Sequence, residues 1–168
     1  MAIIPFTVPA NVTSRGNQFP GLDVQLAYKV HSEFLRSGRV PIVEVLNRQD
    51  WPGKRDEFFN GNFGAIEMAR AAGYDLVLVG FVDNMTSLDQ MSSYTKVIET
   101  ETGMTIWYGR VTARTKRDQY DSLRAQLALP GIDIHPHRKP SLYPSFIIDK
   151  LAQCIVSNIN DDYRVVPE

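Results

Sequence analysis

The stretch YDLVLVGFV, from Tyr74 to Val82, is the most informative part of this sequence, because almost every residue in it is apolar. A strand with one face in water alternates apolar and polar residues, whereas a strand covered on both faces is apolar nearly throughout. Gly73 stands directly before the stretch and favours a break in the preceding element. The sequence therefore predicts a central β-strand with other elements packed on both of its faces.

Two further strands are expected after the central one. They are MSSYTKVIETE (Met91–Glu101) and MTIWYGRVTART (Met104–Thr115), both rich in β-branched and aromatic residues. Gly103 lies in the short connection between them, and a short connection with glycine favours an antiparallel return. Trp107 and Tyr108 are adjacent on the second strand, so we expect their side chains to face opposite sides of the sheet.

Two strand–helix units precede the central strand. Short apolar runs predict strands over Ala2–Val8 and Arg39–Leu46. Helical spacing of apolar residues predicts helices over Leu22–Leu35 and Phe63–Ala72, the second ended by Gly73. Each helix would connect one strand to the next, and two such strand–helix–strand connections imply that the first three strands run parallel. The inward positions expected on the first helix are Leu22, Leu26, Ala27, Val30, Phe34 and Leu35.

A long amphipathic helix over Ser141–Asp161 ends the pattern, with Pro144 in its first turn, where a missing N–H costs little. The element order is therefore β-α-β-α-β-β-β-α. It predicts a single α/β (α+β) domain over residues 1–161, a mixed sheet of about five strands with helices packed on it, and a C-terminal tail over 162–168. The inward positions expected on the last helix are Phe146, Ile147, Leu151, Cys154, Ile155 and Ile159.

Composition excludes several classes of protein. The 168 residues are 43% hydrophobic and 22% charged, which suits one globular domain. A net charge of −1 gives no bulk field that would favour nucleic acid, and no run is long enough to span a membrane. After Met1 the chain enters AIIPFTV directly. We therefore expect a cytoplasmic protein, or a periplasmic or outer-membrane-associated one if a signal peptide was removed.

The motifs of common catalytic and cofactor sites are missing from the sequence. It has no dinucleotide-binding glycine motif, phosphate-binding loop, nucleophile elbow or zinc-protease motif, so we assign no catalytic residue, cofactor or metal ligand. His135 and His137 could bind zinc, but a site needs three or four ligands and Asp133 is the only carboxylate nearby. Arg138 and Lys139 could hold an anion or simply be exposed. Cys154 fits a helix and cannot form an intramolecular disulfide.

The order of four motifs carries a resemblance to a known family. AIIPF from Ala2 is followed by GLDVQLAYKVHSEFLRSGRVPIVEV, AIEMARAAGYDLVLVGFV and YTKVIETETGMTIWYGRV. In this order they resemble the TolB amino-terminal-domain-like group of bacterial envelope (lipo)proteins, which includes CsgG and LpoB. The chain departs from the group at Pro41, and the segments Trp51–Asn62 and Asp118–Pro140 resemble insertions.

The resemblance implies a non-enzymatic, protein-binding domain of the bacterial cell envelope. Such a domain acts as a subunit or activator of an envelope, secretion or flagellar assembly, with other envelope proteins as partners and a homo-oligomeric ring as one arrangement. Two other functions stay open. The loops after the first and third strands, with Asp83, Asn84 and Asp89, could bind a small molecule or nucleotide. The sheet could also bind nucleic acid, although the near-neutral charge argues against it.

Aromatic residues in polar surroundings are the first candidates for partner contacts. Trp51, Phe58 and Phe59 could be interface anchors, or they could fold back to cover the sheet. The second candidates lie in the breaker-rich loop near the last helix: His135, His137, Arg138 and Lys139.

Overall fold

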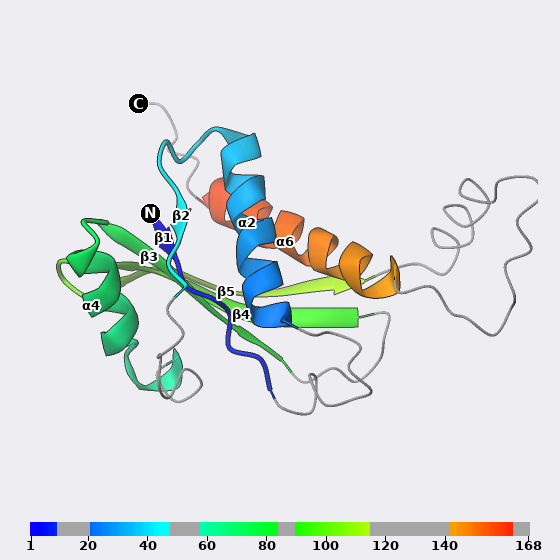
Figure 1. The fold of residues 1–168 in the computed structure, drawn as a ribbon, viewed down its shortest axis with the longest axis horizontal. Helices are drawn as coiled ribbons and strands as arrows, with labels where there is room; N and C mark the ends of the chain where they lie inside the picture. Colours follow the sequence, from blue (N-terminus) through cyan, green and yellow to red (C-terminus); the bar gives the residue numbers. More distant parts are fainter. Residues whose placement is uncertain (10–20, 48–57, 84–89, 115–141, 163–168) are drawn as a thin grey trace, which may run out of the picture.

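The computed structural model describes residues 1–9, 21–47, 58–83, 90–114 and 142–162, with side chains of the last range described from Phe146 onward. Five strands form one mixed sheet in the order β2-β1-β3-β4-β5, which confirms the predicted fold class (Figure 1). β1 pairs in parallel with β2 and β3, and β4 pairs antiparallel with β3 and β5. The strands are β1 (Ala2–Ile3), β2 (Glu44–Val45), β3 (Leu76–Val82), β4 (Gln90–Glu99) and β5 (Thr105–Arg114).

The three long helices that the structure describes are divided between the two faces of the sheet (Figure 1). α2 (Leu22–Ser37) and α6 (Leu142–Asp162) pack against each other on one face, where α6 also contacts β4 and β5. α4 (Phe63–Ala71) packs against β3 on the other face. Pro144 is the third residue of α6, in its first turn as expected.

Alternate residues of β3 enter two separate hydrophobic cores. Leu78 and Val82 join the core under α2 and α6, whereas Val77 and Val79 join the core under α4. All four side chains are almost completely buried. This confirms that the apolar stretch is a central strand covered on both faces.

The first two strands are shorter than predicted. Regular pairing of the first strand covers only Ala2–Ile3, because Pro5 has no N–H to donate to a neighbour. The chain returns to β3 at Thr7, whose N–H donates to the carbonyl of Gly80 at 2.8 Å. The strand predicted from Arg39 reduces to Glu44–Val45, with the N–H of Leu46 donating to Ile3 just beyond it.

Two helix positions that we expected to be buried face solvent. Leu35 is 52% exposed near the end of α2, and Phe146 is 37% exposed near the start of α6. Both lie at the border of an apolar stripe, where helical spacing assigns a residue to a face less sharply than in the middle of the stripe. The other inward positions predicted on α2 are buried.

Glycine at position 73 closes α4 as predicted. Its N–H donates to Arg70, and the N–H of Tyr74 donates to Ala69, which is the hydrogen-bond pattern of a Schellman motif. Gly73 has φ +80°, and no atom lies within 4 Å of the place that a Cβ would occupy. Its role at this position is therefore conformational rather than steric.

Gly73→Ala is expected to lower the free energy of unfolding by about 1–2 kcal/mol, because a Cβ disfavours the left-handed backbone. Gly73→Asn should cost less, since asparagine tolerates this conformation better than alanine. Urea unfolding of the three proteins measures both values. Equal stability of the alanine variant and the original protein would contradict the argument.

Candidate functional site

The outer face of β4 and β5, the side that points away from α6, is only partly covered by α4, which packs against β3. Buried and exposed residues alternate along β5. Trp107 is 7% exposed under α6, whereas Tyr108 is 56% exposed on the outer face, as expected for adjacent residues of a strand. The outer-face positions of β5 are Ile106, Tyr108, Arg110, Thr112 and Arg114.

Two tyrosines and two cations form a compact group in the middle of this face. Tyr94 pairs across the strands with Arg110, and Lys96 pairs with Tyr108. The Arg110 guanidinium lies 5.4 Å from the centre of the Tyr94 ring, and the Lys96 ammonium lies 5.9 Å from that of Tyr108. The two tyrosine rings stack at 6.5 Å with 13° between their planes. We call these four residues the tyrosine–cation cluster.

Lys96 connects the cluster to a group of phenylalanines. Its Nζ donates to the carbonyl of Phe58 at 2.7 Å and lies 4.6 Å from the centre of the Phe58 ring. Desolvation by burial lowers the pKa of Lys96 below its ordinary value. The ring of Phe59 meets those of Phe58 and Phe81 edge-on at 5.2 and 5.4 Å. One continuous set of contacts thus runs from Phe59 to Arg110.

The other end of the cluster is held by an ion pair. Arg110 donates to the carboxylate of Asp83 at 2.9 Å, just beyond the end of β3. Arg114, further along β5, donates through Nε to the side-chain oxygen of Gln90 at 3.0 Å. Asp83, a candidate small-molecule contact in the sequence, therefore binds a cation of the chain itself. Asn84 and Asp89 lie outside the described residues.

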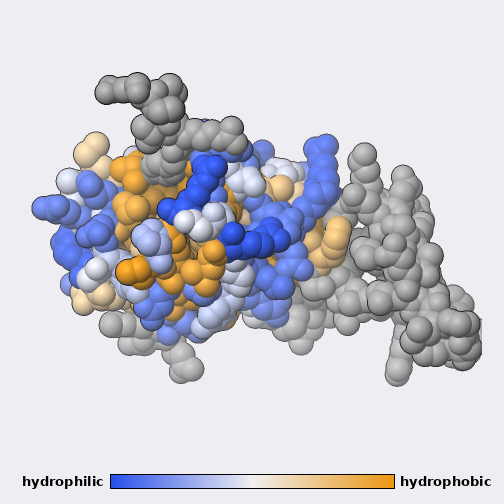
Figure 2. Space-filling model, turned by 90° about the horizontal axis from the view of Figure 1, so that it is seen from above, coloured by the Kyte–Doolittle hydropathy of each residue, from blue (hydrophilic) through white to orange (hydrophobic). Residues whose placement is uncertain are grey.

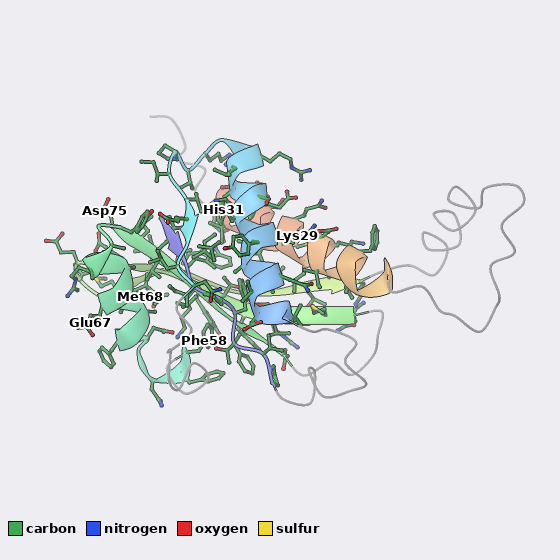
Figure 3. All side chains as sticks on the ribbon, in the orientation of Figure 1. Lys29, His31, Phe58, Glu67, Met68 and Asp75 are labelled. Carbon is green, nitrogen blue, oxygen red and sulfur yellow. The ribbon has the colours of Figure 1, made fainter. Side chains whose placement is uncertain are left out.

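Two of the predicted partner-binding residues fall within the described part of the chain. Phe58 is 2% exposed and belongs to the core under α4, on the opposite side of the sheet from Lys29 (Figure 3). Phe59 is 60% exposed, and its ring contacts Phe58, which in turn contacts Lys96 of the tyrosine–cation cluster. The contacts proposed for five further residues stay predictions, because those residues lie outside the described ranges: Trp51, His135, His137, Arg138 and Lys139.

The tyrosine–cation cluster was not predicted, although a sequence signal for it exists. Tyr94 and Lys96 stand two apart on β4, and Tyr108 and Arg110 stand two apart on β5. Residues two apart on a strand share a face, so each strand brings one tyrosine and one cation to the same side. The strand register, which the sequence does not state, then sets each tyrosine opposite a cation.

A second group of exposed apolar side chains lies around α2 and the segment before β2. Tyr28, Leu35 and Ile42 are each at least half exposed. On the side of the molecule seen from above, hydrophobic side chains gather among hydrophilic ones (Figure 2).

The described residues were also compared with the requirements of a metal site and of a membrane-spanning helix. Within these ranges, no three His, Cys, Asp or Glu side chains come close enough to hold a metal ion. The Nε2 atom of His31 lies 3.1 Å from the carbonyl oxygen of Val43, a contact between α2 and the approach to β2. None of the helices described has the length and apolar character needed to cross a bilayer.

Comparison with known proteins finds similar folds but does not identify a family. No protein-family model and no curated protein matches the sequence. The fold resembles that of CT253. This hypothetical protein from Chlamydia trachomatis is 14% identical, with a TM-score of 0.56 over 94% of this chain and 93% of CT253.

Two weaker structural similarities involve other bacterial proteins. The PelC dodecamer of Paraburkholderia phytofirmans is 16% identical, with a TM-score of 0.49 over 90% of this chain and 83% of PelC. The LpoB C-terminal domain of Escherichia coli is 16% identical, with a TM-score of 0.36 over 67% of this chain and 82% of that domain. Identities this low concern the fold alone, so the family assignment stays a prediction.

Proposed function

We propose that this chain is a non-enzymatic, protein-binding domain of the bacterial cell envelope and that its partner docks on the outer face of β4 and β5. The observation that carries the proposal is the tyrosine–cation cluster, in which Tyr108 is 56% exposed and stacks on Tyr94. The envelope setting rests on the ordered motifs that resemble the TolB amino-terminal-domain-like group. Within that setting, the chain would act as a subunit or activator of a larger assembly.

The composition of this face is that of a protein interface. Tyrosine and arginine are enriched at protein interfaces and among the residues that dominate binding energy. Both tyrosines stand on paired strands of ten residues, so the backbone that carries them is fixed by the sheet. A partner would therefore meet large side chains that are already ordered, which reduces the entropy lost on binding.

Site-specific photo-crosslinking tests the proposal in the bacterium that carries the gene. Tyr108 is replaced by benzoyl-phenylalanine, which keeps an aromatic ring at the exposed position. We expect a defined adduct with an envelope protein, or with a second copy of this chain if the assembly is a homo-oligomeric ring. Mass spectrometry of the adduct identifies the partner.

The matched control places the same photo-reactive residue at Gln153, which is exposed on α6 on the other side of the sheet. This position should give no adduct of the same mass. Identical adducts from both positions, or none from position 108, would argue against the outer face as the contact surface. A catalytic activity that is lost on replacing Tyr108 would argue against a non-enzymatic role.

A further inference from the structure

We infer that the segment bound on the outer face is acidic and extended, and that it lies along β4 and β5 with its carboxylates against Lys96, Arg110 and Arg114. This inference rests on the proposed function and specifies the chemistry of the partner. The charges of the face, their spacing along the strands and the surroundings of Lys96 support it.

The outer face concentrates positive charge on a chain whose net charge is −1. The outward positions of β4 from Gln90 to Ile98, and of β5 from Ile106 to Arg114, hold three cations and no carboxylate. Asp83 is the nearest acid in the described contacts, and it neutralises only part of this charge through its pair with Arg110. A partner of complementary charge would be steered to this side of the molecule.

The cations are spaced to suit an extended chain. Lys96 on β4 pairs directly with Tyr108 on β5, and Arg110 lies two residues beyond Tyr108. Lys96 and Arg110 are therefore separated along the strand direction by one two-residue step. Arg114 lies two further steps along β5. One such step is about 7 Å, which is also the separation of side chains on one face of an extended peptide. Acidic side chains at alternate positions of the peptide could therefore meet successive cations.

The surroundings of these cations strengthen a carboxylate contact. The Lys96 ammonium lies against the rings of Phe58 and Tyr108 and is partly shielded from water. Charges attract more strongly where water is displaced, and arginine can hold a carboxylate with two parallel hydrogen bonds. Tyr108 and Ile106 would supply apolar contact between the charged positions.

Single-stranded nucleic acid fits the same face less well. Its binding depends on many phosphate contacts and on aromatic rings that are open to the bases. Here Tyr94 already contacts both Tyr108 and Arg110, which leaves less ring surface for stacking. The three cations of the face would also provide only a small share of the phosphate contacts that such binding needs.

Fluorescence anisotropy with three labelled probes tests the inference on the whole chain. The probes are a peptide of alternating Glu and Ser, a peptide of alternating Lys and Ser, and oligothymidylate. We expect the acidic peptide to bind most tightly and to weaken as sodium chloride is added. Lys96→Gln and Arg110→Gln should each weaken its binding about tenfold, the effect of losing one charge-assisted hydrogen bond.

Lys29→Gln is the matched control, because Lys29 lies on α2 and pairs with Asp149 on the opposite side of the sheet. This variant should bind the acidic peptide like the original protein, and circular dichroism should show that all variants are folded. Equal binding of acidic and basic peptides, or an equal effect of all three substitutions, would overturn the inference. Tightest binding of oligothymidylate would replace it with a nucleic-acid role.

The photo-adduct at position 108 separates this inference from the proposed function. An adduct that forms equally well with Lys96→Gln and Arg110→Gln would refute the acidic segment and leave protein binding in place. No adduct from the protein with its cations intact would instead refute the proposed function itself.

Discussion

Gly80→Ala is expected to lower the free energy of unfolding by about 1–3 kcal/mol, the usual cost of overfilling a packed core. A Cβ at Gly80 would lie 2.1 Å from the Cε1 atom of Phe6, whose side chain is completely buried. The two backbones cannot separate easily, because the N–H of Thr7 donates to the carbonyl of Gly80 at 2.8 Å. In thermal unfolding each kcal/mol should lower the Tm by about 2–4 °C for a chain of this size.

A compensating substitution makes this prediction specific. Phe6→Leu alone should also destabilise the protein, because it leaves space beside Gly80. Combined with Gly80→Ala, it should cost less than the sum of the two single effects, since the smaller side chain makes room for the new methyl group. Strict additivity in urea unfolding would show that the clash with the Phe6 ring is not the cause.

Trp107→Ala should have the largest effect on stability, a loss of about 3–5 kcal/mol. The indole is almost buried beneath α6, and its ring lies so close to Gly109 that a Cβ there would come within 2.7 Å of it. Its Nε1–H also donates to the Asp162 carboxylate at 2.6 Å. The side chain therefore fastens the end of α6 to β5 both by packing and by a hydrogen bond.

Trp107→Phe separates these two contributions, because it keeps an aromatic ring but removes the donor. We expect a loss of about 1–3 kcal/mol, since part of the indole is lost and the carboxylate of Asp162 is left without its donor. Asp162→Ala and the double variant complete a mutant cycle in urea unfolding. If the effects of the two single substitutions simply add, the hydrogen bond contributes nothing to stability.

Much of the fold could be predicted because the signals are local. The central strand is apolar throughout, the hairpin has a glycine in its turn at φ +73°, and Gly73 closes α4. The lengths of β1 and β2 were overestimated, since pairing between strands far apart in the sequence depends on three-dimensional contacts that residue preferences do not contain. Two prolines are local signals of this shortening, because Pro5 follows the last paired residues of β1 and Pro41 precedes the start of β2.

The candidate site was harder to predict than the fold. The sequence favours aromatic residues in polar stretches as contacts, and of the two that the structure describes, Phe59 is exposed whereas Phe58 is in the core. The tyrosine–cation cluster instead depends on register. Tyr94 meets Arg110 and Lys96 meets Tyr108 only in the pairing that is observed, and a slip of one residue would send one strand's pair to the other face.

The division of the interior into two cores also has a consequence for synthesis on the ribosome. The core under α4 is built from residues between Ala2 and Ile98, so its parts have all emerged before the second strand of the hairpin is complete. The core under α2 needs Ile147, Leu151 and Ile155 of α6, which are made only after all five strands. The apolar stripe of α2 and the inner side of β5 therefore stay without the cover of α6 until that helix has also been made. That interval is when a nascent chain of this protein would depend most on chaperones.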